Sequence, residues 1–323
     1  MQAPTTLKEA IATFADAQKA HEAIVALRWP NGVACPRLGC GSADVHFIAT
    51  RRIWRCKECK RQFSAKVGTV FEDSPIGFDK WLPALWMLTN CRNGVSSYEI
   101  ARDLGVCQKT AWFMLHRLRL AMKDDADDQM LGPVEADETF VGGKRRRSDW
   151  DERKRGPHDD KAIVMGIVER GGRARAIIIP NVQATSLLPK IREHVARGAT
   201  VYTDEAAGYR KLRDDYVHYV INHAQRYVDR HITTNRVENF WSCLKRTLGG
   251  TYIAPRAFHL ERYLDEQIFR FNVRGQEDDS RFVQAAKGAD GRRVTYKELT
   301  KSHPIWRLKP GRAKNSPIYK ATP

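Results

Sequence analysis

The sequence lacks several features that would place it in large classes of proteins. It has no run of about 18 uninterrupted apolar residues, so we expect no membrane span. The N-terminal stretch carries acidic residues and no apolar core of the signal-peptide type, which favours a cytoplasmic protein. A glycine-rich GxxxxGK loop is also missing, which argues against an ATP-driven motor. The seven cysteines of such a chain indicate metal ligands or free thiols rather than disulfides.

The charge balance, by contrast, is strongly basic. Among 323 residues, 55 Lys and Arg stand against 38 Asp and Glu, which gives a formal net charge of +17 and a pI near 9.7. This excess predicts a polyanionic partner, with nucleic acid as the first candidate and the nucleoid as the expected place of action. A merely soluble basic protein is the alternative, and it is disfavoured because basic residues recur beside the candidate motifs.

The first motif is a set of four cysteines that follows an N-terminal helix. Apolar residues at helical spacing predict that helix within residues 1–30. In residues 31–70, Cys35 and Cys40 form one close pair, and Cys56 and Cys59 form a second pair about fifteen residues later. This spacing predicts a zinc ribbon in which four thiolates hold a structural Zn²⁺ ion. Four ordinary thiols in a small β-rich module are the alternative.

Residues 75–123 contain three helical stretches, the last two of which are separated by a glycine turn. A short helix, a turn and a longer basic helix match a helix-turn-helix motif, whose second helix enters the major groove of DNA with its N-terminal residues toward the bases. We therefore expect Gln108, Lys109 and Thr110 to contact DNA. Any small helical bundle can show the same pattern.

An acidic linker, residues 124–133, leads to a region of α/β character at 134–273. Apolar residues alternate with acids at 134–141, and further strands are expected at 162–168, 174–179, 200–204 and 218–221. Helices between and after these strands predict a sheet with helices on its faces. Residues 274–323 are polar and basic, and we expect them to form a poorly ordered or docking tail.

Three acids stand at informative places in this region. Asp137 and Asp204 end separate strands, and Glu238 opens a helix. If they converge, their oxygens suit two divalent cations that activate a phosphodiester for attack. Basic side chains from a loop and from the helix would then neutralise substrate phosphates, and these are Lys144, Arg145, Arg146, Lys245 and Arg246. A solvated edge strand for Asp137 and a capping box between Asn235 and Glu238 are the alternatives.

The order of the cysteine-pair ribbon, the helix-turn-helix and the segments EADETFVGGK, VYTDEAAGY and HITTNRVENFWSCLKRTLGGTY resembles the insertion-sequence transposases of the IS1595 group. This resemblance implies a ribonuclease-H-like domain, a DDE triad at Asp137, Asp204 and Glu238, and two Mg²⁺ or Mn²⁺ ions per active site. It also implies cleavage of DNA strands by water at the element's terminal inverted repeats and attack of the freed 3′-hydroxyl on target DNA. The gap between Cys35 and Cys40 is longer than the two residues usual in the family.

Transposition joins two DNA ends, so we expect a homo-oligomer of at least two chains on double-stranded DNA. Three other functions stay open at this point. A DNA-binding regulator would have no need of three acids, a plain nuclease would cut without strand transfer, and a recombinase with a covalent serine or tyrosine would work without divalent metal.

Overall fold

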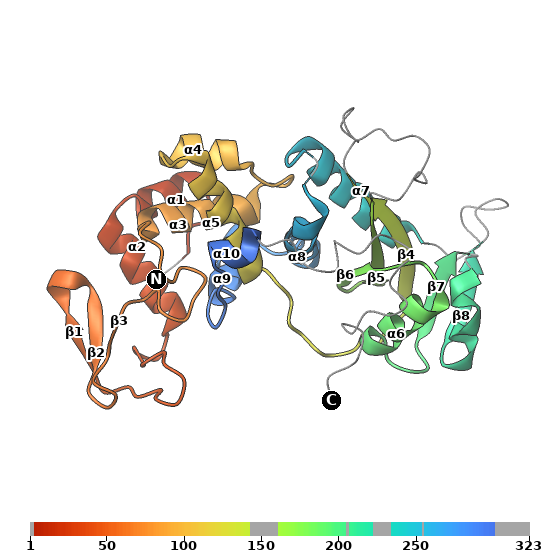
Figure 1. Ribbon diagram of the computed structural model, residues 1–323, viewed down its shortest axis with the longest axis horizontal. Coiled ribbons are helices and arrows are strands. Elements are labelled where there is room, and N and C mark those ends of the chain that lie inside the picture. The colour runs from red at the N-terminus through yellow and green to blue at the C-terminus, as the bar shows by residue number, and fades with distance from the viewer. Residues whose placement is uncertain (1–2, 143–160, 205–206, 222–233, 254, 301–323) are drawn as a thin grey trace. The chain divides into compact units, whose positions relative to one another are not determined.

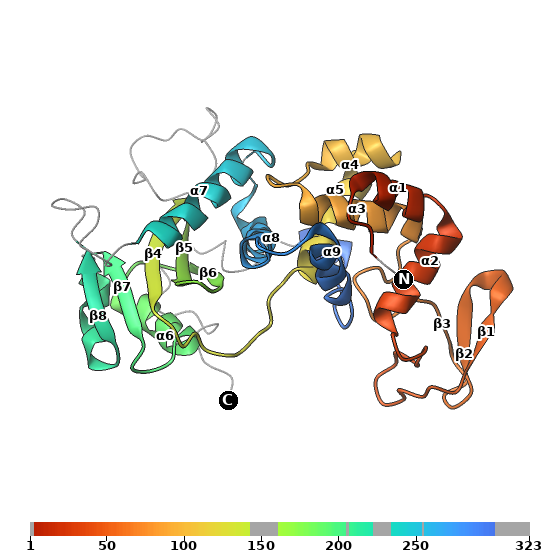
Figure 2. The same cartoon turned by 180° about the vertical axis from the view of Figure 1, so that it is seen from behind.

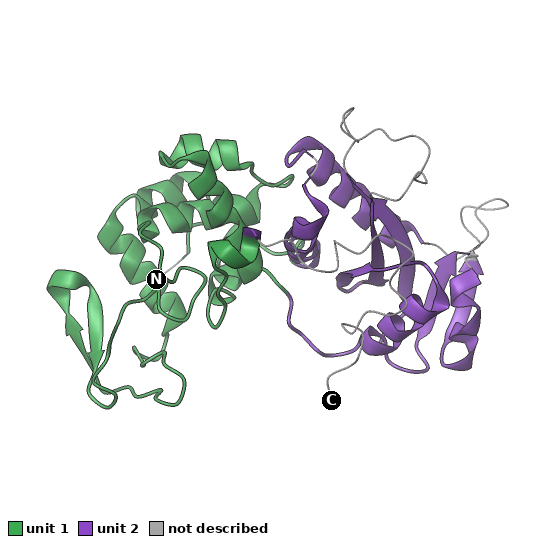
Figure 3. Ribbon diagram, viewed as in Figure 1, with its two compact units in different colours: residues 1–123, 273–299 green, residues 124–272, 300–323 purple. Residues whose placement is uncertain are grey.

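The computed structural model describes residues 3–142, 161–204, 207–221, 234–253 and 255–300 of the chain. The chain forms two compact units (Figure 3). In the described part of the chain, the first joins residues up to 123 to residues 273–299, and the second comprises residues 124–272. The first unit therefore combines segments that are far apart in the sequence.

Helices make up most of the first unit (Figure 1). They are α1 (Leu7–Phe14), α2 (Ala17–Arg28), α3 (Phe78–Asn90), α4 (Ser97–Leu104), α5 (Gln108–Ala121), α9 (Asp278–Lys287) and α10 (Tyr296–Thr300). The pair α4 and α5 is delimited by local chemistry. Ser96 and Glu99 form a capping box at the start of α4, and Gly105 ends it with a left-handed φ of 60°.

The N-terminal segment differs from the expected single helix, because it forms α1 and α2 with a break between them. Asp16 causes the break, since its side chain accepts hydrogen bonds from the backbone N–H groups of Gln18 and Lys19 and so begins a second helix. After α2 in the chain, β1 (Val45–Ile48), β2 (Ile53–Cys56) and β3 (Gln62–Phe63) form an antiparallel sheet, with the 3₁₀ turn η1 (Ala49–Arg51) after β1.

The segment expected to be a tail from residue 274 is, in its described part, an integral piece of the first unit. Phe282 of α9 is 1% exposed and stacks on Phe14 with ring centroids 5.4 Å apart. Arg28, whose side chain is 5% exposed, forms an ion pair of 2.8 Å with Asp290. Charged residues surround the apolar face of α9 in the sequence and obscure it, and its burial comes from α2, α3 and α5, which lie more than 150 positions earlier. Residues 301–323 lie outside the described residues.

The second unit is a mixed α/β structure built on five strands. They are β4 (Val134–Val141), β5 (Ala162–Glu169), β6 (Ala174–Ile179), β7 (Thr200–Asp204) and β8 (Val217–Ile221). Their order in the sheet is β6-β5-β4-β7-β8. Strands β4, β5 and β6 are mutually antiparallel, whereas β7 runs parallel to β4 and β8 runs parallel to β7.

Helices cover both faces of this sheet (Figures 1 and 2). On one face, α6 (Ala184–His194) and the 3₁₀ helix η3 (Ala207–Asp214) pack against alternate strand residues such as Val134 and Ala136. On the other, α7 (Asn235–Gly250) and α8 (Leu260–Asn272), preceded by the turn η4 (Ala257–His259), pack against residues such as Val164. Because side chains alternate along a strand, Glu135 and Asp137 share the α7 face.

The expected linker at 124–133 is partly built into the second unit. Met130 is fully buried and forms an isolated parallel bridge with Val195. Asp128 pairs with Arg173 at 2.6 Å. These contacts are made to positions far along the chain, so the local composition of the segment did not reveal them.

Candidate active site and metal centre

Asp137 and Asp204 come together through the pairing of two parallel strands. In the ladder between β4 and β7, Val134 pairs with Val201 and Glu135 pairs with Tyr202. The ladder stops there, two residues before Asp137 and Asp204, so the two aspartates lie on neighbouring strands and face the same side of the sheet. Asp204 ends β7 as expected, whereas Asp137 lies in the middle of β4, which continues to Val141. Both aspartates are half-buried, so Asp137 is not on a solvated edge strand.

Glu238 is delivered by the first turns of α7, and it is exposed. The N-cap of α7 is Thr234, which makes Val237 rather than Glu238 the third helical residue. The capping box between Asn235 and Glu238 is therefore absent. Instead, Glu238 Oε1 accepts a hydrogen bond of 3.0 Å from Thr234 Oγ1.

The electrostatics of Asp137 connect the three acids. Burial is the main cause that raises the pKa of Asp137, and the negative charges of Asp204 and Glu238 raise it further. A group of carboxylates offers oxygen ligands of the kind that divalent cations bind. Within the described ranges, the four cysteines form a group placed to hold a metal ion as the chain stands, whereas the three acids do not.

Trp241 is a site residue that the sequence reasoning took only as part of the buried helical stripe. Its indole Nε1 donates a hydrogen bond of 2.9 Å to Asp137 Oδ2. Opposite Asp137 on β5 lies Gly166, where a Cβ atom would come within 2.6 Å of Trp241 Cζ2. The glycine inside a strand was the available signal, because it indicates that another group approaches the backbone closely.

Glu138 points to the opposite face of the sheet, as the strand alternation predicted. Tyr209 of η3 donates a hydrogen bond to Glu138 Oε1. Burial, followed by the charges of Asp137 and Asp204, raises the pKa of Glu138 to about 7. Glu205, the other neighbouring acid, lies outside the described residues.

The four predicted zinc ligands form a compact cluster in the first unit. All four sulfur atoms of Cys35, Cys40, Cys56 and Cys59 lie within 4.8 Å of one another. The sulfurs of Cys35 and Cys59 are 3.8 Å apart, and those of Cys40 and Cys56 are 3.6 Å apart. Zn–S bonds of about 2.3 Å in a tetrahedron require sulfur separations of about 3.8 Å. The backbone N–H of Cys59 is the main cause that lowers the pKa of Cys56 to about 7, which favours the thiolate.

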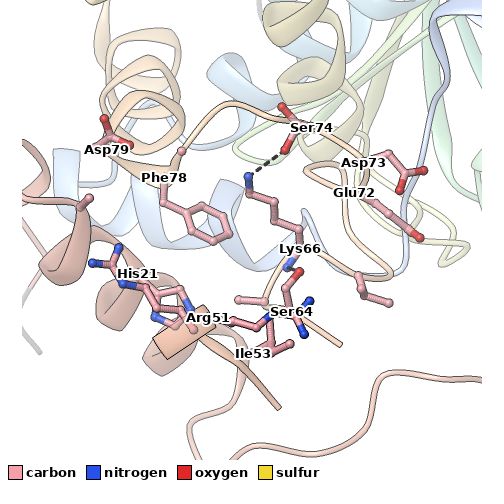
Figure 4. Close-up of a pocket in the computed structure, with 15 residues that line it drawn as sticks. His21, Arg51, Ile53, Ser64, Lys66, Glu72, Asp73, Ser74, Phe78 and Asp79 are labelled. Atoms are coloured by element: carbon pink, nitrogen blue, oxygen red, sulfur yellow. Dashed lines mark hydrogen bonds between the residues drawn. The ribbon is translucent and has the colours of Figure 1, made fainter. Parts of the chain in front are cut away.

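A hollow of about 460 Å³ lies next to the ribbon in the first unit (Figure 4). Its walls carry both signs of charge, since His21, Arg51 and Lys66 face it together with Asp73 and Asp79. The ammonium of Lys66 is half-buried and donates to the backbone carbonyls of Ser74 at 2.8 Å and Ile76 at 2.6 Å. Lys66 therefore stabilises the loop at Ser74 and Ile76, and we assign it no role in ligand binding.

The residues predicted to contact DNA occupy different environments. On α5, Lys109 is exposed with its Nζ 4.9 Å from the centroid of the Tyr296 ring, whereas Gln108 donates to Ser97 Oγ of α4 at 2.8 Å. Thr110 is half-buried and its hydroxyl lies 3.0 Å from the Cys107 sulfur. On α7, Lys245 and Arg246 are exposed. Lys144, Arg145 and Arg146 lie outside the described residues.

Comparison with known proteins decides the family. Residues 129–272 match the ISXO2-like transposase domain, and residues 15–62 match the transposase zinc-ribbon domain. A protein in the transposable element ISH50 of Halobacterium salinarum is 30% identical over 285 residues, which cover 80% of this chain and 94% of that protein. The chain belongs to the IS1595 family of insertion-sequence transposases.

Two further similarities are partial. A transposase-like protein of Haemophilus influenzae is 39% identical to this transposase over 97 residues, 30% of this chain and 78% of that protein. Two solved structures, the Mos1 strand transfer complex and the mariner Mos1 paired end complex with Mg, are each 14% identical to this chain with a TM-score of 0.23. The matches cover 65% of this chain and 78% and 79% of the respective Mos1 chains. That TM-score is too low to bear on fold or function.

The two domain matches cover both candidate centres of the transposase. The first spans β4 to α8 and contains Asp137, Asp204 and Glu238, and the second contains all four clustered cysteines. No helix in the part of the chain that the structure describes is both long and apolar enough to cross a membrane.

Proposed function

We propose that this transposase cuts DNA strands at the ends of its element and joins the freed 3′-hydroxyl to target DNA, with divalent cations held by Asp137, Asp204 and Glu238. The parallel pairing of β4 with β7, which ends two residues before Asp137 and Asp204, is the observation that carries the proposal. The strand order β6-β5-β4-β7-β8 with helices on both faces supports a ribonuclease-H-like fold for this domain.

The donor set fits hard divalent cations such as Mg²⁺ or Mn²⁺, because it consists of carboxylate oxygens. When bound, two such ions polarise the scissile phosphate, activate the attacking oxygen and stabilise the leaving oxygen. The protein's own part is to hold the three carboxylates in place. Trp241 occupies one oxygen of Asp137 and thereby orients the other, while Lys245 and Arg246, exposed farther along α7, would bind substrate phosphates.

The remaining parts of the proposal concern DNA and assembly. The α4–α5 pair acts as a helix-turn-helix that presents Lys109 to DNA, and the cysteine cluster binds Zn²⁺ to hold the ribbon together. At least two chains assemble on a pair of element ends. Sedimentation of a single chain on paired end DNA would contradict the last point.

The decisive experiment compares the wild type with Asp204→Asn on a labelled duplex that carries the element's ends. The variant keeps the shape of the side chain and removes its charge. We expect strand transfer in the wild type only when Mg²⁺ is supplied, and no product from the variant, while both bind DNA equally. Asp214→Asn, an exposed acid of η3, is the matched control for loss of one charge.

The other outcomes separate the alternative functions. Binding without cleavage by the wild type would favour a DNA-binding regulator, and cleavage without joining would favour a plain nuclease. Product in the absence of Mg²⁺ would favour a covalent recombinase. Mg²⁺ should be omitted rather than chelated, because a strong chelator would also remove zinc from the cysteine cluster.

A further inference from the structure

Glu135 is the most deeply buried of the described acids on the sheet face that α7 covers, and the residue as a whole is 0% exposed. Its Oε1 accepts a hydrogen bond of 3.0 Å from Arg170 Nε, and its Oε2 accepts from the backbone N–H groups of Arg236 at 2.8 Å and Val237 at 3.2 Å. These N–H groups belong to the first turn of α7, where the helix itself supplies no acceptors. Thr234, the N-cap residue, makes no side-chain cap bond to them, so a carboxylate from β4 caps α7.

Arg170 extends this network to the neighbouring strand. Its guanidinium lies 3.8 Å from the centroid of the Tyr202 ring on β7, and its backbone N–H donates to the carbonyl of Pro133 at 2.8 Å. Its side chain is 20% exposed, whereas that of Glu135 is 1% exposed. One arginine therefore contacts both of the parallel strands that carry Asp137 and Asp204.

Each of these contacts is made one or two residues before one of the three acids. Tyr202 precedes Asp204 by two residues, Glu135 precedes Asp137 by two, and Val237 immediately precedes Glu238. Each element that carries an acid thus contributes a contact just before that acid. The contacts run from Tyr202 to Arg170, from Arg170 to Glu135 and from Glu135 to the start of α7. They therefore join β7, β4 and α7 within two residues of the acid that each element carries.

We propose that Glu135, Arg170 and Tyr202 are positioning residues that set the spacing of Asp137, Asp204 and Glu238 for divalent-cation binding. This inference rests on the proposed function. The three acids repel one another, so their spacing needs fixed supports. A hydrogen-bonded ion pair supplies direction as well as attraction. Altering a group that hydrogen-bonds a metal ligand lowers metal affinity about 10–100-fold, and these three residues act one step farther out, on the elements that carry the ligands.

The test measures Mn²⁺ affinity of the full-length protein by the electron paramagnetic resonance signal of free Mn²⁺, together with the Mg²⁺ concentration that gives half-maximal strand cleavage. Arg170→Met removes the cation and the stacking contact and keeps a long apolar stem. We expect Mn²⁺ binding about tenfold weaker or more, and a matching rise in the half-maximal Mg²⁺ concentration. Arg170→Lys, which keeps the charge, should restore part of the loss.

Two further variants serve as controls for effects on folding. Glu135→Gln alone leaves a partly buried arginine without its carboxylate, so the double variant Glu135→Gln/Arg170→Met removes both charges and is better tolerated. Arg192→Met breaks a more exposed ion pair, 2.7 Å from Asp215, and should leave Mn²⁺ affinity unchanged. A merely structural role would lower the melting temperature of the Arg170 variants without changing Mn²⁺ affinity far below that temperature.

Folded Arg170→Met and double variants with the Mn²⁺ affinity and Mg²⁺ dependence of the wild type would overturn the positioning role and leave the proposed function intact. If Asp204→Asn bound Mn²⁺ as tightly as the wild type, the proposed function would be overturned, and this inference with it.

Discussion

Trp241 and Asp137 are joined by a hydrogen bond of 2.9 Å between the indole Nε1 and the carboxylate Oδ2, although 104 positions separate them in the chain. The bond lowers the pKa of Asp137 and so works against the burial and the neighbouring charges that raise it. It also ties α7, which carries Glu238, to the strand that carries Asp137. The same residue that fills the core therefore holds the site together.

Substitution of Gly166, which lies against the Trp241 ring, tests the hydrogen bond between Trp241 and Asp137. The Cβ atom of Gly166→Ala would come within 2.6–2.7 Å of the Trp241 ring, so the indole must move and its hydrogen bond to Asp137 should be lost. We expect a loss of about 1–3 kcal/mol in the free energy of unfolding, measured by urea denaturation, and reduced strand cleavage. Gly249→Ala, at an exposed helical position with open space, is the control and should be neutral or slightly stabilising.

The pH dependence of stability should reveal Glu138. Its pKa in the folded protein is about 7, above the ordinary value of 4.5, chiefly because of burial. A raised value means that the folded state favours the protonated acid, so this contribution is complete below about pH 4.5 and is lost as the pH rises through 7. Relative to Glu138→Gln, the wild type should lose roughly 3 kcal/mol over that window in Mg²⁺-free buffer. Parallel stability curves for the two proteins would contradict the assignment.

The cysteine cluster should contribute folding free energy to the ribbon only with its metal. Cys59→Ala removes one of four ligands, so we expect purified protein with little or no zinc and a loss of near-ultraviolet circular dichroism from the buried Trp54. Zinc content is measured by elemental analysis. Cys91→Ala, a thiol outside the cluster, should keep one zinc per chain.

The contribution of α9 to the first unit can be measured at Phe282. Phe282→Ala opens a cavity beside Phe14, and a truncation of this kind costs about 3–5 kcal/mol. Thermal unfolding of the full chain should show the loss. Ser280→Ala, on the exposed side of the same helix, should leave the melting temperature unchanged. Equal melting temperatures for both variants would mean that α9 contributes nothing to the stability of this unit.

DNA binding through α5 predicts a specific salt dependence. Lys109→Gln should weaken binding to end DNA and reduce the slope of log K against log salt by about 0.9, because one fewer phosphate counterion is released. Fluorescence anisotropy over a salt series measures that slope. Lys8→Gln, an exposed lysine of α1, should leave the slope as it is. An unchanged slope for Lys109→Gln would remove this residue from the DNA interface.

Features of this protein that depend on short-range spacing could be predicted from its residues alone. Four cysteines in two close pairs predicted a cluster that the structure contains, and the period of two in β4 placed Asp137 on the face opposite Glu138. The helical period of α7 likewise separated its buried residues, such as Phe240, from the exposed Glu238. Such patterns are legible because they repeat within a few residues.

Features that depend on contacts between distant segments became visible only in the folded chain. The parallel pairing of β4 with β7 brings Asp137 and Asp204 onto neighbouring strands, and no local pattern encodes a register between strands 67 positions apart. The cap that Glu135 provides for α7 and the return of α9 to the first unit were equally hidden. Each is fixed by burial and hydrogen bonding between segments that meet only after folding, because that is where buried polar groups find their partners.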